Sequence, residues 1–486
     1  MYAGIDFGTS NCSIGVWEAD KPILLPLEGD DPRLPSAMYA SRFDLDVEPI
    51  DFFELNRRIG LAISRQAAQI KRGEEHGRKV RELSRDELEN IERGIMRREL
   101  AERARRKYEG QTLSDALYSD SEIVFGEEAI LRHIESPQSG YFIKSPKSFI
   151  GADIESHHVD RFSEIITRML AYIKTRAEQR QSASIDSVVL GRPVTFHGQR
   201  GEAGNKQALR ILERSAIAAG FKYVEFLMEP IAAAFDFERG LLRDRVVLVL
   251  DAGGGTTDCS MVRIGPSYRK MNDRSSCVLG YAGDRIGGTD IDAKLAYSRI
   301  MPLLGSESTL KNGLPMPSSA YWNAVKINDT NAQNKFFSDR TRREIESYLV
   351  QAKETDKIQR LLNVQRGRFS YALNRSAELA KIRLSDQGLI RCSLGYIEPG
   401  LDFLVSRADL EKSIKRELEI FLSLMKEVES QAGRRPEVIC VTGGTAKSPI
   451  VEEWIRSHFG NIDIVVGDFF GSIASGLTTR AHRIYQ

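Results

Sequence analysis

One pattern of apolar and polar residues occurs twice in this chain, about 245 residues apart. In the first copy, an apolar run from residue 2 ends at Asp6, and a glycine turn leads to a second apolar run over 12–16. In the second copy, a run from residue 247 ends at Asp251, and three glycines precede Asp258 and the next run. Two apolar runs joined by a tight glycine turn are typical of a β-hairpin. The repetition predicts two similar lobes that face one ligand between them.

The rest of the chain alternates between strand-type and helix-type patterns. Apolar runs bounded by turn residues predict strands at 34–39, 122–126, 141–144, 187–190, 224–228, within 390–404 and at 438–442. Helical periodicity predicts helices at about 158–181, 205–220, 408–430 and 471–484. Pro230 suits the first turn of a further helix that begins beside Glu229. Alternation of strands and helices predicts an α/β fold.

The stretch from Lys71 to Glu109 has a different character. Of its 39 residues, 23 are charged, 13 of them basic and 10 acidic. Apolar residues recur at helical spacing, which favours a helix with one narrow buried stripe. Charges of mixed sign at short spacing favour ion pairs on a solvated face. Two interpretations are open: a helical insertion, or an arm that binds a partner.

Composition limits the class of protein. A chain of 486 residues is too long for one ordinary core, and 41% hydrophobic with 28% charged residues is typical of a globular protein. A net charge of +1 argues against a nucleic-acid or membrane surface, and no apolar run is long enough to span a bilayer. The first strand begins almost at once, so no signal peptide is expected. The five cysteines are scattered without a Cys-x-x-Cys pair, which predicts buried thiols in the cytoplasm and neither disulfides nor zinc.

The glycine turns suggest a phosphate site. Glycine lets backbone N–H groups approach phosphate oxygens, and Thr9, Ser10, Thr256 and Thr257 add hydroxyl donors. Asp6 and Asp251 could hold Mg²⁺ through its waters. Glycine pairs at 287–288 and 443–444 each lie at the end of an apolar run. No Walker-type loop occurs at these turns, so the predicted site is of another class.

Six segments together resemble the actin/sugar-kinase/heat-shock ATPase superfamily, and specifically the nucleotide-binding domain of DnaK-type chaperones of the heat shock protein 70 family. These segments are 4–11, 147–151, 229–234, 251–258, 377–385 and 441–449. Details at 144–151, 191–193 and 321–323 are similar to the short YegD branch of that family.

The resemblance implies an α/β protein with an actin-like ATPase fold. Two ribonuclease-H-like lobes would surround a central nucleotide cleft, with helical insertions in each. Lobe I would cover 1–245 with an insertion at about 36–140, whose variable part is 50–120. Lobe II would cover 246–486 with an insertion at about 293–385. Because the chain stops about 37 residues after Pro449, no peptide-binding domain is expected.

The resemblance also implies roles for individual residues around ATP or ADP with Mg²⁺. The metal and its water shell would be positioned by Asp6, Asp251 and Asp258. The β-phosphate would be contacted by Thr9, Ser10 and Asn11, and the β- and γ-phosphates would be wrapped by Gly253, Gly254, Gly255 and Thr256. The nucleotide would also be bound by Gly8, Gly287 and Gly288. Adenosine would be held from one side by Glu378, Lys381 and Ser385, and the cleft closed from the other by Gly443, Gly444 and Lys447. Catalysis would rest on Lys147, Glu229, Asp251 and Thr256, with Lys147 near the γ-phosphate and Glu229 polarising the attacking water.

Simpler interpretations exist for the same side chains. Lys147 alone would be read as a solvated lysine, and Glu229 as a charge at a helix start. Glu378 and Lys381 have the i,i+3 spacing of a surface ion pair. Pro193 and Arg200 resemble the proline switch that couples nucleotide to lobe rotation in the family, although Gly191 and Arg192 replace the usual residues before the proline.

The function predicted from these patterns is slow hydrolysis of Mg-ATP by a molecular switch whose lobes open and close. Its partner would be an unknown protein client or co-chaperone, with no nucleic acid or membrane involved, and the sequence leaves the oligomeric state open. One alternative is a small-molecule kinase of the same superfamily. Another is a non-enzymatic nucleotide-sensing scaffold or an actin-like filament protein.

Overall fold

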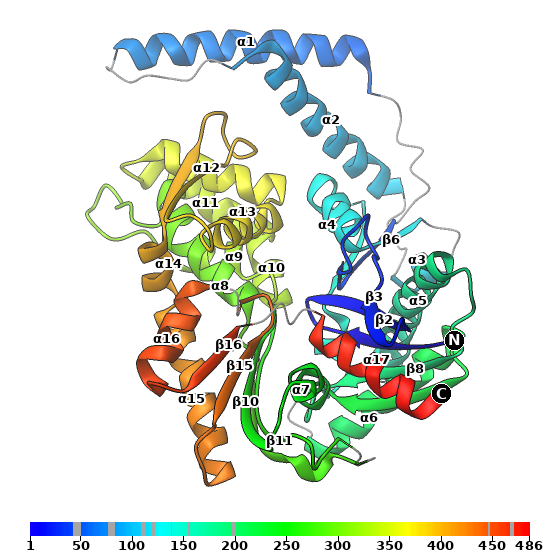
Figure 1. The fold of residues 1–486 in the computed structure, drawn as a ribbon. Helices are drawn as coiled ribbons and strands as arrows, with labels where there is room; N and C mark the ends of the chain where they lie inside the picture. Colours follow the sequence, from blue (N-terminus) through cyan, green and yellow to red (C-terminus); the bar gives the residue numbers. More distant parts are fainter. Residues whose placement is uncertain are drawn as a thin grey trace.

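Two sheets of closely similar strand order form the two lobes of the molecule (Figure 1). The computed structural model describes residues 1–41, 50–75, 83–107, 113–118, 122–137, 139–153, 156–196, 201–269, 271, 273–445, 448–466 and 471–486. We call the body around the first sheet lobe I and the body around the second sheet lobe II.

The sheet of lobe I has the order β3-β2-β1-β8-β9, and β4 pairs with β2. Its strands are β1 (Tyr2–Phe7), β2 (Asn11–Glu18), β3 (Lys21–Leu24), β4 (Leu34–Pro35), β8 (Ser187–Arg192) and β9 (Tyr223–Met228). The predicted hairpin is confirmed, because β1 and β2 pair antiparallel with Asp6 opposite Ser13. β8 and β9 continue the sheet in parallel.

The sheet of lobe II repeats this arrangement in the order β12-β11-β10-β15-β16. Its strands are β10 (Arg245–Ala252), β11 (Thr257–Ile264), β12 (Val278–Asp284), β15 (Val438–Thr442) and β16 (Asp463–Val466). The second hairpin is also confirmed, with Asp251 opposite Asp258. β15 and β16 run parallel to β10, as β8 and β9 run parallel to β1. The acidic residue that ends each leading strand therefore occupies the same position in both lobes.

Helices cover both faces of the first sheet. Successive strand residues point to opposite faces, so Val188 and Leu190 join the core beneath α5 (Ser156–Gln181) and α6 (Gly201–Ala218), while Val189 joins the core beneath α7 (Glu229–Arg239) and α17 (Ser472–Tyr485). The last helix thus packs on lobe I although it lies in the range predicted for lobe II (Figure 1). The division at residue 246 stays a prediction.

The insertion of lobe I combines a small sheet with helices. Its strands have the order β6-β5-β7, with β5 (Ala37–Ser41), β6 (Ile123–Phe125) and β7 (Gly140–Lys144). Its helices are α1 (Phe52–Glu75), α2 (Arg85–Lys107), α3 (Leu113–Tyr118) and α4 (Gly126–Glu135). α1 and α2 pack on each other through Leu55, Ile59 and Met96 and extend away from the body (Figure 1). The described part of the charged stretch is therefore helical except at residues 83 and 84, and its role with a partner stays a prediction.

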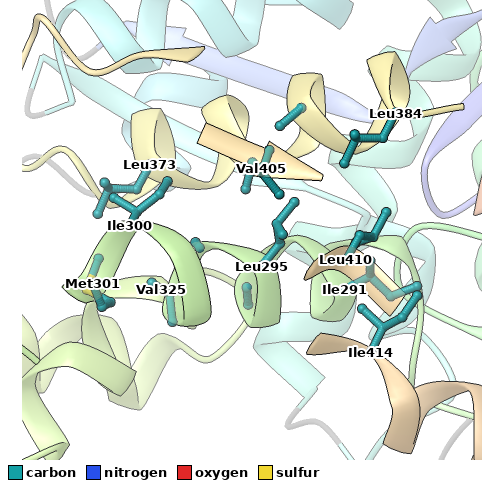
Figure 2. Packing of buried hydrophobic residues seen from close by; sticks show 14 of the residues in the cluster. Ile291, Leu295, Ile300, Met301, Val325, Leu373, Leu384, Val405, Leu410 and Ile414 are labelled. Carbon is teal, nitrogen blue, oxygen red and sulfur yellow. The ribbon is translucent and has the colours of Figure 1, made fainter. Parts of the chain in front are cut away.

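The insertion of lobe II is mostly helical. It runs through α8 (Gly288–Leu295), α9 (Ser319–Val325), α10 (Thr330–Phe336), α11 (Asp339–Gln351), α12 (Thr355–Gly367) and α13 (Ser370–Arg383), and then the hairpin β13 (Leu389–Ser393) and β14 (Asp402–Ser406). Figure 2 shows its core, where Leu295, Leu373 and Val405 meet from α8, α13 and β14. The helix predicted at about 408–430 is two helices, α14 (Arg407–Ser413) and α15 (Lys415–Ala432), that meet at Ile414. A further helix, α16 (Pro449–Phe459), follows β15.

Two of the composition-based expectations can be compared with the structure. All five cysteines are free and buried, as the sequence predicts. None of the described helices combines the length and apolar character needed to cross a bilayer.

The two lobes touch through polar and aromatic contacts between their insertions. Arg375 on α13 of lobe II forms an ion pair with Glu127 on α4 of lobe I at 2.5 Å. His133 on α4 stacks on Phe142 with ring centroids 4.4 Å apart and meets the edge of Tyr371 on α13 at 4.5 Å. Burial lowers the pKa of His133 to about 3, because the charged imidazolium loses its hydration there and Arg368 adds repulsion.

Substitutions at two glycines test how tightly α17 packs against α7 and whether α1 is free of contacts at Gly60. A Cβ on Gly476 would collide with the backbone carbonyl of Ala232 on α7, whereas a Cβ on Gly60 in α1 would meet nothing within 4 Å. We expect Gly476→Ala to lower the free energy of unfolding by about 3 kcal/mol, since rigid backbone cannot make room. Gly60→Ala should raise it by about 0.5–1 kcal/mol, because alanine favours the helix. Urea unfolding of both variants measures this, and equal effects would contradict the packing.

His133 gives a prediction for pH. A histidine whose pKa is depressed in the fold contributes stability above its unfolded pKa of about 6.5, and that contribution is lost as the pH falls toward 3. The contribution should change by up to about 1.4 kcal/mol per pH unit. We expect the unfolding free energy of His133→Phe minus that of the wild type to increase as the pH falls from 6.5. A difference that stays constant with pH would contradict the burial of His133.

Candidate functional site

A cavity lies between the hairpin turns of the two lobes. It brings together most of the residues predicted to bind phosphate and metal: Asp6, Gly8, Thr9, Ser10, Asn11, Lys147, Glu229, Asp251, Gly253, Thr256, Asp258, Gly443 and Gly444. Pro193, which resembles the proline switch of the family, also lines the cavity. So do residues that have no predicted role in the site: Cys12, Ser13, Arg33, Ser148, Phe196, Thr442 and Ile473. Arg200 and Lys447 lie outside the described residues.

The turns of the two hairpins are in direct contact. The backbone N–H of Gly254 in lobe II donates to the Ser10 hydroxyl of lobe I at 2.5 Å. Within the second turn, the N–H of Gly253 donates to the carbonyl of Thr256 at 2.9 Å. A Cβ on Gly254 would strike Ser10, so the approach of the two turns requires glycine. The two glycine turns that the sequence predicts therefore meet in the structure.

Gly287 and Gly288 lie behind the second turn. The N–H of Gly288 donates to the carbonyl of Gly253 at 2.8 Å, and the N–H of Thr289 donates to that of Gly254 at 2.7 Å. A Cβ on Gly287 would collide with the Gly254 backbone. This glycine pair, at the start of α8, thus holds the 253–255 turn in place from the side away from the cavity.

Lys147 and Glu229 form a buried ion pair at the cavity. Lys147 lies on a short 3₁₀ turn over Pro146–Ser148, and its Nζ is 2.5 Å from Oε1 of Glu229, the first residue of α7. Their side chains are only 5% and 14% exposed, so Lys147 is not a solvated lysine. Burial alone would lower the pKa of Lys147, but the carboxylates of Glu229 and Asp6 outweigh it and raise the pKa.

The two strand-end acids have strongly shifted pKa values. Burial and the nearby Glu229 carboxylate raise the pKa of Asp6 to about 7, and Lys147 offsets only part of this. Burial and repulsion from Glu229, Asp258 and Asp6 raise the pKa of Asp251 well above its ordinary value. The cavity therefore holds four carboxyl groups beside Lys147 and Arg33, which is an environment that attracts a cation.

A metal ion fits this donor set if it keeps its water shell. Among the described residues, no group of three or more His, Cys, Asp or Glu side chains is placed to ligate a metal directly. Mg²⁺ prefers oxygen donors, dehydrates reluctantly and is usually bound by one or two carboxylates together with phosphates and water. Asp6 and Asp251, which lie near the ends of two strands and both line the cavity, offer such donors.

Tyr281 is a polar residue of the site region that the sequence did not reveal. Its hydroxyl donates to Oδ1 of Asp258 at 2.6 Å. Burial and the neighbouring Asp258 charge raise the pKa of Tyr281 far above its usual range, so it remains a hydrogen-bond donor. Tyr281 lies on β12, opposite Ser260 of β11, and no motif spacing marks it.

Two of the predicted adenosine residues, Glu378 and Lys381, lie on α13, and Ser385 follows the end of this helix. Lys381 forms an ion pair with Asp292 at 2.7 Å and donates to the carbonyl of Gly288 at 3.2 Å. Glu378 pairs with Arg375 at 2.8 Å, whereas the simpler interpretation would pair it with Lys381. The backbone carbonyl of Ser385 accepts from Arg407.

Glu378 lines a separate, smaller cavity between the lobes, together with Lys144, Thr289 and Asp292. Burial alone would raise its pKa, but Lys144 and Arg375 outweigh this and lower it. Burial raises the pKa of Asp292 to about 6, although Lys381 opposes the shift. α13 therefore places the Lys381 ammonium beside Gly288, one of the glycines that support the second turn.

Lys381 and Asp292 are both mostly buried, so breaking their ion pair should measurably lower the free energy of unfolding. Lys381→Met leaves the Asp292 carboxylate buried without its partner and should lower the free energy of unfolding by about 3–5 kcal/mol at pH 8. Adding Asp292→Asn removes the unpaired charge and should restore most of the loss. Urea unfolding of both variants tests this, and a single variant as stable as the wild type would show that the pair has no structural role.

Comparison with known proteins identifies similar sequences. A family model described as Hsp70 protein matches residues 143–300. This range contains Lys147, Glu229 and the whole second hairpin. Chaperone protein DnaK of Thermosipho africanus is 24% identical over 360 residues, covering 71% of this chain and 48% of the relative. Chaperone protein DnaK of Thermosipho melanesiensis is 25% identical over 360 residues, with 71% and 49% covered.

The chain spans about half the length of the curated relatives it matches. The duplicated sheets and the cavity between them are arranged as the predicted actin-like ATPase fold requires, and the family match confirms this α/β fold class. Residues 143–300 are therefore similar to the Hsp70 family, and 360 residues of the chain are similar to part of two DnaK chaperones.

Proposed function

We propose that this protein binds Mg-ATP in the cavity between its lobes and hydrolyses it slowly, with water as the acceptor. The observation that carries the proposal is the meeting of two hairpin turns, where Ser10 and Gly254 touch at 2.5 Å beside a buried Lys147–Glu229 pair. One turn alone would be an ordinary hairpin turn. Two turns that face each other across buried acids and a lysine form a site for a triphosphate with its metal.

The triphosphate would be held by the two turns from opposite sides. Thr9, Ser10 and Asn11, with Gly8, would contact the β-phosphate from lobe I. Gly253, Gly254, Gly255 and Thr256 would wrap the β- and γ-phosphates from lobe II. Backbone N–H groups in glycine turns bind phosphate without interference from a Cβ. Support comes from the cavity, which is lined by residues of both turns.

Mg²⁺ would be held through its waters by Asp6 and Asp251, with Asp258 supporting the shell. When bound, it would neutralise phosphate charge during transfer. The raised pKa values of Asp6 and Asp251 support this assignment, since burial and repulsion from nearby carboxylates cause the shifts, and a bound cation would favour the charged carboxylates.

Lys147 and Glu229 would act on the attacking water. The γ-phosphate, carrying negative charge, would compete with Glu229 for the Lys147 ammonium. Lys147 would then counter the charge that develops on the phosphate, and Glu229 would accept a hydrogen bond from the water and orient it. Phosphoryl transfer depends mainly on positioning and charge compensation, so no covalent intermediate is needed.

Adenosine would lie between α13 and the turn after β15. Glu378, Lys381 and Ser385 would hold it from one side, and Gly443, Gly444 and Lys447 would close the other. The contact of Lys381 with Gly288 supports this, because it places α13 beside the phosphate turns. Gly443 and Gly444 line the cavity itself.

The biological role that fits this chemistry is a nucleotide-driven switch with a protein client or co-chaperone. The relatives named as chaperone protein DnaK support it, and lobe opening and closing on nucleotide exchange is a common hinge-type device. Segments 144–151, 191–193 and 321–323 support placing the chain in the YegD-like branch. The cytoplasmic location is part of the same proposal, supported by five buried free thiols.

Lys147→Ala tests the assigned chemistry. The variant should bind ATP with an affinity near that of the wild type, because the turns and the metal provide most of the contacts, but it should release phosphate at least 100-fold more slowly. Single-turnover phosphate release and nucleotide titration measure the two effects separately. Lys222→Ala is the matched control, since this lysine is 67% exposed and pairs with Asp186 outside the cavity.

Unchanged turnover in Lys147→Ala would refute the role of the lysine. Phosphate transfer that requires an added small-molecule acceptor would favour the kinase alternative. Nucleotide binding without phosphate release, accompanied by ATP-dependent light scattering, would favour a filament or scaffold protein.

A further inference from the structure

A single hydroxyl joins a carboxylate of the site to the opposite lobe. Tyr281 belongs to β12 of lobe II, and its hydroxyl lies 2.6 Å from Oδ1 of Asp258 and 3.2 Å from the backbone carbonyl of Thr195. Thr195 belongs to lobe I, in the segment that follows β8. The hydroxyl therefore contacts both lobes at once.

Both of these neighbours are hydrogen-bond acceptors, whereas a phenol has one proton to donate. The shorter distance and the charge of the carboxylate favour donation to Asp258, since hydrogen bonds to ionised groups are shorter and stronger. The hydrogen bond from the hydroxyl to the Thr195 carbonyl is therefore the weaker of the two. Any ligand that draws the Asp258 carboxylate away from the phenol would leave the proton for Thr195.

The segment that contains Thr195 is packed against the back of the site. Pro193 and Phe196 line the nucleotide cavity. Pro193 and Val194 also line a smaller cavity behind it, which Tyr281 shares with Glu229, Asp251 and Asp258. The N–H of Phe196 donates to Asn205 of α6 at 2.7 Å, so this segment is anchored to the body of lobe I.

Tyr281 is itself held firmly from lobe II. Its backbone N–H donates to the side chain of Gln431 on α15 at 2.8 Å. The preceding Gly280 lies so close to α15 that a Cβ there would press on the Val428 carbonyl. The Tyr281 side chain is therefore held in place by lobe II and contacts the 193–196 segment of lobe I, which is itself bonded to α6.

We propose that Tyr281 is a positioning residue that orients the Asp258 carboxylate toward the metal's water shell and couples metal binding to the contact between the lobes. The coupling is the competition of Asp258 and Thr195 for one proton. This inference rests on the proposed Mg-ATP site for its metal part, while the link between the lobes exists in the protein without nucleotide.

Tyr281→Phe tests the proposal, because it removes the hydroxyl and keeps the ring. The control is Tyr321→Phe, since Tyr321 is also buried and its hydroxyl has no hydrogen-bond partner within the described part of the chain. In Tyr281→Phe, the Mg²⁺ concentration for half-maximal ATP hydrolysis should rise on the order of tenfold, as expected for loss of a hydrogen bond to a charged group. The rate at saturating Mg²⁺ should fall much less. Tyr321→Phe should change neither value.

Amide hydrogen exchange gives a second readout that does not depend on activity. In the protein without nucleotide, the amides of residues 194–196 should exchange several-fold faster in Tyr281→Phe than in the wild type and in Tyr321→Phe. If the wild type binds Mg-ATP and Tyr281→Phe matches it in both readouts, the role of Tyr281 is refuted while the proposed function stands. If the wild type binds no Mg-ATP, the proposed function and the metal part of this inference fail, and exchange at 194–196 alone decides the link between the lobes.

Discussion

The crowding of carboxylates around one lysine is the constraint on which the structure of the site depends. Asp6 and Asp251 are brought together from the ends of two strands, and Glu229 lies near both. Lys147 contacts Glu229 directly and compensates only part of the total charge. Burial, together with repulsion between neighbouring carboxylates, raises the pKa of Asp6 and Asp251, so this arrangement is unfavourable without a cation. Such an arrangement of acids persists only if the rest of the fold holds them in place, and it serves a function only if a ligand binds to them.

The framework comes from the two sheets. In each lobe, an antiparallel hairpin leads the sheet and two parallel strands continue it, so both acids end central strands. Glycine at 254 allows the turns to touch, and glycine at 287 and 288 lets α8 support the second turn from behind. α17 packs on the first sheet and, with α7, covers one of its faces. The apolar cores on both faces of each sheet thus fix the positions of the polar side chains that line the cavity between the two lobes.

Local patterns in the sequence predicted much of this, and long-range contacts explain the rest. The hairpins at Asp6 and Asp251 are signalled by their own residues, since a turn and its two strands are neighbours in the chain. Lys147 and Glu229 were predicted as site residues only through resemblance, because 82 positions separate them and no local pattern reports their pairing. Tyr281 was not predicted, because its partners are a side chain on another strand and a carbonyl of the other lobe. The break at Ile414 was also missed, since the helical periodicity continues across it.

Titration calorimetry with ATP, ADP and AMP in the presence of Mg²⁺ tests the central claim most directly. If the paired turns bind a phosphate chain with its metal, ATP and ADP should bind one to one, and AMP should bind at least tenfold more weakly because it lacks the β- and γ-phosphates. Absence of heat with ATP, or equal affinity for AMP and ATP, would contradict this account of the site.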